Sequence, residues 1–296
     1  MMTYEKAIQD VLDYIDNNLG EKLTIESLAA IAHFSPYHFC RVFQWYVGYS
    51  VMIYVRKRRL EFVVSEFSRE RKMIDIAMDY GFETYSGFAK AFKRHYNGIS
   101  PEDYRGLNHP DEKPKPLLLV HMKKYTGGII MTPKIIEKEA FKVAGYSIET
   151  KNVDGDNNRD IPAFWQAYST DGRADKLHDA PFITNHSQYG ICYNHNPESG
   201  GFSYIIGLEV RSGAEVPEEF ETLNVKPSTY AVFSTPPASD EDFVKNIQGT
   251  WVFIMEEWFP TSGYEYAPGS VDFEYYREEM HEKGNVCDIY IPVVKK

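Results

Sequence analysis

Apolar residues in roughly the first hundred positions follow a helical spacing. Over residues 5–19 they recur three and four positions apart, which predicts an amphipathic helix that ends near Gly20. A second apolar run follows Thr24, and Ser35-Pro36 then has the form of a helix start, an N-cap followed by proline in the first turn. Two helices joined by about three residues form a helix-turn-helix.

The same plan returns further along the chain. The phrase SPYHFCRVFQWYVGYS at 35–50 is echoed by TYSGFAKAFKRHYNGIS at 84–100. Because residues four apart share one face of a helix, the phenylalanines repeated in both phrases should point into the core of their own unit. These phenylalanines are Phe39 and Phe43 in the first copy and Phe88 and Phe92 in the second.

The turns and the connection between the two units also have recognisable signals. Gly81 in the second turn can adopt the left-handed conformation, and His33 stands at the equivalent place in the first. Residues 51–67 join the two units with a helical apolar pattern that includes the basic run Arg56-Lys57-Arg58-Arg59. We expect this helix to fix the separation of the two units.

The faces opposite the phenylalanines are polar and basic. Such faces fit the major groove of DNA, although a solvated surface helix is an equally ordinary interpretation of any single basic residue. Residues 1–107 hold 14 basic and 14 acidic side chains, so the net charge of -11 lies entirely in the rest of the chain. The face residues are Tyr37, His38, Arg41 and Gln44 in the first unit and Tyr85, Ser86, Lys90, Lys93 and Arg94 in the second.

Residues 5–107 resemble the tandem helix-turn-helix DNA-binding domain of the AraC/XylS family of transcription regulators, an all-α fold of seven helices. The resemblance rests on LTIESLAAIAHFSPYHFCRVFQWYVGYSVMIYVRKRRLEFV and on IDIAMDYGFETYSGFAKAFKRHYNGISPEDYR. It implies that double-stranded DNA and RNA polymerase are partners, and members of this architecture often bind DNA as monomers. It also implies that helices starting near Pro36 and Tyr85 enter two successive major-groove segments, roughly 34 Å apart.

The resemblance further implies which side chains meet DNA. Arg41 is the strongest candidate for reading a base, because arginine can bind guanine O6 and N7 with two hydrogen bonds. Cys40 and Gly87 are smaller than the polar residues often found at their positions, so each either admits a thymine methyl group or carries no specificity. The implied DNA-binding residues are Tyr37, Cys40, Arg41, Gln44, Tyr85, Ser86, Gly87, Lys90, Lys93 and Arg94.

The spacing of apolar residues changes after a linker at 108–132, and residues 133–296 alternate in the manner of strands. Within the linker, LLLV is either a short strand or a docking segment. The second domain contains two helical stretches, IPAFWQAYST and DFVKNIQGTWVFIMEEWFP, the latter with a start signal at Ser239-Asp240 and a stop at Pro260. The order strand, helix, strand, strand occurs twice, which predicts a duplicated α+β unit with an antiparallel sheet.

Residues 133–296 resemble the GyrI-like domain, a small-molecule-binding module found alone or fused behind DNA-binding domains. With the first domain, the chain is similar to the Rob-type subgroup of AraC regulators, which implies that it senses an effector. The segments that carry the likeness are KVAGYSIET, FWQAY, YGICYN, FSYIIGLEV, TYAVF, WVFIMEEWFPTSGYEYAPGSVDFEYY and CDIYIPV.

Glu274 corresponds to the glutamate that GyrI-like sensors place at the floor of their pocket. A carboxylate buried among aromatic rings is neutral unless a cationic ligand supplies the countercharge. The resemblance therefore implies a sensor, even a multidrug sensor, of hydrophobic or aromatic molecules. A positive charge on such a molecule would favour its binding. The alternative is that the aromatic residues only form the core. The candidate walls are Trp165, Tyr193, Tyr230, Trp251 and Trp258.

Two other functions remain open at this point, a ligand-sequestering protein and a GyrI-like hydrolase that would use Glu274 with a tyrosine such as Tyr193. No Ser-His-Asp order, HExxH, P-loop or GxGxxG is present, so we expect no catalytic site. The three cysteines and nine histidines lack ligand spacing, so we expect neither metal nor cofactor. Without a leader-like start or an apolar stretch long enough to span a bilayer, a cytoplasmic protein is expected.

Overall fold

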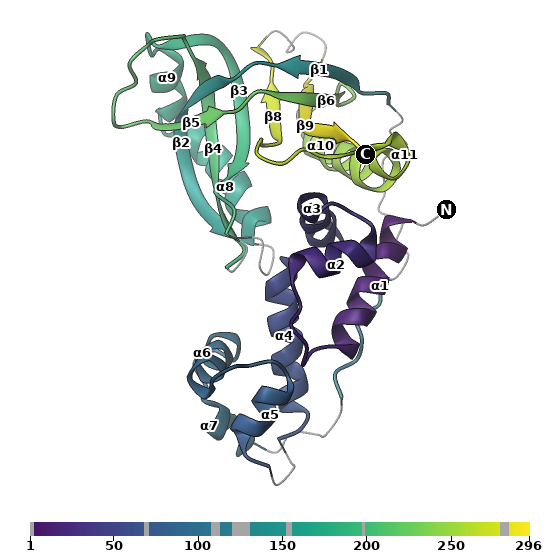
Figure 1. The fold of residues 1–296 in the computed structure, drawn as a ribbon. Helices are drawn as coiled ribbons and strands as arrows, with labels where there is room; N and C mark the ends of the chain where they lie inside the picture. The colour runs from purple at the N-terminus through teal and green to yellow at the C-terminus, as the bar shows by residue number, and fades with distance from the viewer. Residues whose placement is uncertain are drawn as a thin grey trace. The chain divides into compact units, whose positions relative to one another are not determined.

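The computed structural model describes residues 3–67, 71–107, 113–119, 131–151, 156–196, 199–278 and 284–296. The chain divides into two compact units, Met1–Val120 and His121–Lys296, which are taken in turn (Figure 1). Across the described ranges, no helix is long and apolar enough to cross a membrane.

The described part of the first unit is helical, as predicted. Helices α2 and α3 form one helix-turn-helix, α5 and α6 form the other, and α4 joins the two (Figure 1). This arrangement confirms the tandem helix-turn-helix fold. The helices are α1 Tyr4–Asn17, α2 Ile25–Ala32, α3 Pro36–Val47, α4 Val51–Val64, α5 Met73–Asp79, α6 Tyr85–His95 and α7 Pro101–Arg105.

Local chemistry explains both turns. His33 and Gly81 adopt left-handed conformations, with φ of 57° and 79°. The hydroxyl of Ser35 accepts the backbone N–H of His38, and the hydroxyl of Thr84 accepts that of Gly87, so each recognition helix begins with a satisfied cap. Buried anchors follow on each helix: Phe39, Phe43, Phe88 and Phe92 are all fully buried, as predicted.

Two predictions about the first unit are wrong. Helix α1 ends at Asn17 rather than near Gly20, because Asn18 caps it by bonding back to Ile15 O and Tyr14 O. His38 does not lie on the polar face of α3. Its ring is fully buried, with Nε2 2.8 Å from the hydroxyl of Tyr4, because the start of α3 packs against α1.

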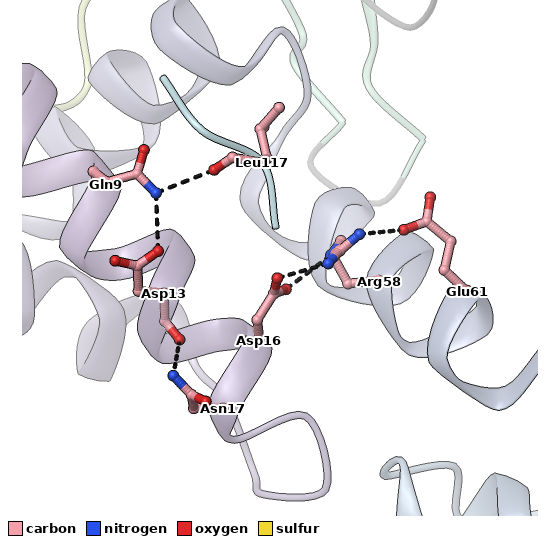
Figure 2. Close-up of polar contacts among 7 residues, drawn as sticks. All are labelled: Gln9, Asp13, Asp16, Asn17, Arg58, Glu61 and Leu117. Carbon is pink, nitrogen blue, oxygen red and sulfur yellow. Dashed lines mark hydrogen bonds and ion pairs between the residues drawn. The ribbon is translucent and has the colours of Figure 1, made fainter. Parts of the chain in front are cut away.

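An ion pair inside the first unit joins α1 to α4 (Figure 2). Arg58 of α4 donates through Nε and Nη2 to the two oxygens of Asp16, at 2.8 and 2.6 Å, and through Nη1 to Glu61 at 2.6 Å. Only 5% of Arg58 is exposed. Removing one partner from a buried pair of this kind typically costs about 3–5 kcal/mol, since the remaining charge loses its compensation.

The segment after the first unit's last helix docks on α1. Gln9 Nε2 donates to the carbonyl oxygen of Leu117 at 3.1 Å (Figure 2). Gln9 Oε1 also accepts the backbone N–H of Leu119 at 2.8 Å. Residues 113–119 form no strand. Of the two interpretations of LLLV, docking therefore holds for its described residues, while Val120 lies outside them.

The second unit contains an antiparallel sheet with helices, which confirms the predicted α+β class (Figure 1). The strand order is β1-β6-β9-β8-β3-β4-β2-β5, with β7 also paired to β9. The strands are β1 Lys134–Lys138, β2 Phe141–Lys151, β3 Ile183–Tyr193, β4 Gly201–Val210, β5 Glu221–Val225, β6 Ser228–Ser234, β7 Tyr264–Tyr266, β8 Phe273–Tyr276 and β9 Cys287–Lys295.

The helices of this unit differ from the predicted ones at their ends. They are α8 Asp156–Thr170, α9 Arg173–His178, α10 Asp240–Phe253, the π-helix η2 Ile254–Trp258 and α11 Phe259–Ser262. The prediction that Pro260 stops the helical stretch is wrong. Pro260 lies in the first turn of α11, where its missing N–H costs little. The stretch ends at Gly263, which adopts a left-handed conformation with φ of 73°.

Strand pairing determines which side chains share a face of the sheet. Gly190 of β3 pairs with Glu274 of β8, which pairs with Ile289 of β9, which pairs with Phe233 of β6. Side chains of directly paired residues lie on the same face, and neighbours along a strand alternate. Glu274 therefore lies near the middle of one row that crosses four strands.

Candidate functional site

The polar face of α3 consists of the predicted residues other than His38, which is buried. Tyr37, Cys40, Arg41 and Gln44 are each partly exposed, while the opposite side of the helix is buried. Burial raises the pKa of the Cys40 thiol to about 11, and the carboxylate of Glu26 adds to the shift. The thiol is therefore uncharged at neutral pH, and Arg41 is the cationic member of this face.

The face of α6 is more exposed and more basic. Its first turn carries Tyr85, whose hydroxyl donates to Glu102, and Lys93 and Arg94 lie in the last turn. Cations at the surface of a recognition helix suit phosphate contacts, which supply affinity without specificity. The predicted residues of this face that are exposed are Ser86, Gly87, Lys90, Lys93 and Arg94.

In the second unit, Glu274 is the centre of a polar network. Trp251 of α10 donates its indole N–H to Glu274 Oε1 at 3.0 Å, and the hydroxyl of Tyr276 donates to Oε2 at 2.7 Å. Burial nevertheless raises the pKa of Glu274, because the two neutral donors only partly offset the loss of water, and Asp272 adds repulsion. The carboxylate is thus well oriented and electrostatically under-compensated.

A second tryptophan lies against the same network. The indole N–H of Trp165, on α8, donates to the hydroxyl of Tyr204 at 2.9 Å, and its ring meets that of Tyr276 edge to face at 5.0 Å. Gly190 makes room for this contact, since a Cβ there would lie 2.2 Å from the Tyr204 hydroxyl. Indoles from two helices and phenols from two strands therefore surround one carboxylate.

A cavity of about 510 Å³ opens beside Tyr276. This volume lies within the usual range for small-molecule sites. Two imidazoles line part of it, with His178 Nδ1 3.1 Å from His186 Nδ1, and burial and this neighbour lower the pKa of His178. The lining residues are His178, His186, Gln188, Phe243, Tyr276, Arg277, Glu278, Asn285 and Val286.

The structure brings together only some of the predicted ligand residues. Trp251 bonds Glu274 directly, and Trp165 reaches it only through the ring of Tyr276. Tyr193 and Tyr230 lie on the opposite face of the sheet, in a separate apolar cluster with Ile191. The pairing of Glu274 with Tyr193 that the hydrolase alternative would use is therefore not formed. Within the described ranges, no group of three or more His, Cys, Asp or Glu side chains could hold a metal ion.

The remaining predicted wall, Trp258, packs against other aromatic rings. Its ring lies 5.0 Å from that of Phe233 and 4.9 Å from that of Phe259. Conversely, Tyr276 and Tyr204 were not among the predicted pocket residues. Tyr276 could have been found, because it is two positions from Glu274 on one strand, whereas Tyr204 enters only through the pairing of β4 with β3.

Comparison with known proteins matches both units. Residues 28–106 match a helix-turn-helix domain family, and residues 134–293 match the Cass2 family, described as integron-associated effector binding protein. The match to the Escherichia coli (strain K12) regulatory protein SoxS is 32% identical over 105 residues, 35% of this chain and 97% of SoxS.

Two further similarities were found. The chain is 38% identical over 105 residues to YbfP of Bacillus subtilis (strain 168), described as an uncharacterized HTH-type transcriptional regulator; this covers 35% of each chain, so the match spans about a third of that relative. Among solved structures, SAV2435 bound to tetraphenylphosphonium superposes with a TM-score of 0.46 at 17% identity, covering 55% of this chain and 94% of that one.

The raised pKa of Glu274 predicts a pH dependence of stability. The folded-state pKa of Glu274 lies above the ordinary 4.5, so folding favours the protonated carboxyl. The stability that this preference contributes is fully present below pH 4.5 and is lost as the pH rises through the folded-state pKa. Relative to Glu274→Gln, the wild-type second unit should therefore become less stable between pH 4.5 and neutral pH. Urea denaturation followed by tryptophan fluorescence measures this difference.

Glu257→Gln, which alters an exposed carboxylate on η2, is the control and should differ from wild type by a constant amount. A difference between wild type and Glu274→Gln that does not change with pH would contradict the account of Glu274.

Proposed function

Because the chain belongs to the AraC-type DNA-binding transcription regulators, we propose that its effector is a hydrophobic or aromatic cation held at Glu274. Its C-terminal effector-binding domain is of the Cass2 family. The observation that carries this proposal is the carboxylate itself. Glu274 receives two neutral donors, Trp251 and Tyr276, at hydrogen-bond distance and has its pKa raised by burial. A cation bound beside it supplies the charge that these donors lack.

The surroundings of the carboxylate favour the same class of ligand. The indole and phenol rings of Trp165, Trp251 and Tyr276 present faces and edges to which flat or cationic groups bind. The acidic balance of the chain beyond residue 107 raises the local concentration of cations. A site that depends on stacking and one charge accepts many molecules of this kind, which is the basis for multidrug sensing.

For the first unit, α3 and α6 would enter two successive major-groove segments. Arg41 and Lys90 would lie at base-reading positions, while Lys93 and Arg94 would neutralise phosphates. Cys40 and Gly87 would lie where a small side chain admits a thymine methyl group. RNA polymerase would then be the partner through which bound protein alters transcription.

Arg41 and Lys93 should respond differently to substitution. Arg41→Ala should cost about 1–3 kcal/mol of specific binding and relax the preference at one base pair, because a base contact is lost. Lys93→Ala should weaken binding to all sequences alike and lower the salt slope by about 1, because a phosphate contact is lost. Fluorescence anisotropy with duplexes that the full chain selects from a random library provides the readout; unchanged specificity in Arg41→Ala would refute the assignment of α3.

The charge requirement of the effector site can be tested with two molecules of one shape. N-benzylquinolinium is a flat cation, and 1-benzylnaphthalene is its neutral counterpart. In tryptophan-quenching titrations at neutral pH, the wild-type chain should bind the cation at least about tenfold more tightly, because Glu274 supplies a countercharge in a site of low dielectric constant. Glu274→Gln should remove most of this difference, whereas Glu257→Gln should keep it.

Equal affinity of the wild-type chain for the two molecules would contradict a cation site. Binding of neither would contradict the pocket itself.

A further inference from the structure

One arginine of α4 contacts the loop before the first helix-turn-helix and the turn of the second. Arg59 Nη1 donates to the carbonyl oxygen of Gly81 at 2.9 Å, and Nη2 donates to that of Glu21 at 2.8 Å. Gly81 lies in the turn between α5 and α6, and Glu21 lies in the loop between α1 and α2. A single planar guanidinium therefore joins the loop that precedes the first helix-turn-helix to the turn of the second. Lysine could not span both carbonyls with one fork of donors.

Two glycines bring these segments close enough for the contact. A Cβ on Gly20 would lie 2.5 Å from the carbonyl oxygen of Asp79, a backbone atom at the end of α5. Backbone cannot move aside as a flexible side chain does. Any side chain at Gly20 must therefore push the end of α5 away from the loop between α1 and α2. A Cβ on Gly81 would lie 2.6 Å from Arg59 Cζ, so the missing side chain there makes room for the guanidinium.

We propose that Arg59, Gly20 and Gly81 form a clamp that sets the separation and orientation of α3 and α6, and so the distance between the two DNA half-sites that the chain accepts. Helix α4 also links the two units, and Arg58 fixes it to α1 through Asp16. The clamp attaches the second helix-turn-helix to the loop before the first one, at a point away from α4. This attachment removes the freedom of the two helix-turn-helices to bend about α4. The inference rests on the proposed binding of α3 and α6 to two successive grooves.

The half-site distance matters because of the geometry of DNA. Insertion of one base pair moves the second half-site by about 3.4 Å along the axis and turns it by roughly a tenth of a full rotation. A clamped protein cannot follow both changes, so one groove contact is lost, and with it much of the about 10²- to 10⁴-fold gain that linked contacts provide. A protein free to bend at α4 would tolerate the insertion.

The test uses the full-length chain and a duplex that it selects from a random library, together with versions that have one base pair inserted or deleted between the half-sites. The ratio of dissociation constants, altered over selected spacing, is the quantity measured. We expect a ratio of at least about tenfold for the wild type. In Arg59→Met and in Gly20→Ala the ratio should fall severalfold, with weaker binding to the selected duplex.

Arg56→Met is the matched control. It removes the same charge from the same helix, and among the described residues Arg56 makes no hydrogen bond to Glu21 or Gly81. The spacing ratio of this variant should equal that of the wild type, whatever happens to its overall affinity.

The outcomes separate the clamp from a general structural role. Substitutions that only destabilise the fold would weaken binding to every duplex by one factor and leave the ratio unchanged, which would overturn the clamp. Where a variant loses cooperative thermal unfolding, Arg59→Lys replaces it in the test, since lysine keeps the charge and loses the double contact. A spacing ratio in Arg59→Lys equal to that of the wild type would then overturn the clamp. A wild-type chain insensitive to spacing would instead contradict two-groove binding itself.

Discussion

The incomplete compensation of one carboxylate organises the effector-binding half of this protein. Glu274 is half-buried and receives neutral donors at hydrogen-bond distance, from Trp251 and Tyr276. The ring of Tyr276 in turn meets Trp165, whose N–H is fixed by Tyr204. A chain of contacts thus runs from α10 through the sheet to α8, so a ligand that neutralised the carboxylate, as proposed above, would also act on the position of both helices.

The DNA-binding half uses its buried charge in a different way. Arg58 and Arg59 are neighbours on α4, yet Arg58 is compensated by carboxylates inside the first unit, while Arg59 bonds backbone carbonyls of two separate turns. One arginine secures a helix to its own bundle, and the next connects two bundles. The basic run on α4 is therefore structural at these two positions, although its composition resembles that of a DNA-binding surface.

Features that depend on local sequence could be predicted. The cap at Ser35, the left-handed turns at His33 and Gly81, and the buried phenylalanines all follow from helix geometry and turn chemistry. These predictions succeeded because each depends on neighbours within about one helical turn. The hydrogen bond from Trp251 to Glu274 agrees with the ligand residues that the family resemblance implied, whose role stays a prediction.

Features that depend on distant pairing could not be predicted. The opposite placement of Tyr193 and Tyr230 is decided by which residue of β3 pairs with Glu274, and a shift of one residue would reverse their faces. His38 is buried because of how α1 packs on α3, a contact that the pattern within α3 alone does not contain. Arg59 likewise acquires its role only once two turns, far apart in sequence, meet.

If Glu274 holds the effector of a transcription regulator, a cation bound there should change how tightly the same chain binds DNA. The most direct measurement is the affinity of the full-length protein for its selected duplex with and without saturating N-benzylquinolinium, in wild type and in Glu274→Gln. Linked sites typically differ by about 5- to 150-fold, so we predict a change of at least about fivefold in the wild type and none in Glu274→Gln. An unchanged DNA affinity in a wild-type chain that has bound the cation would contradict the claim.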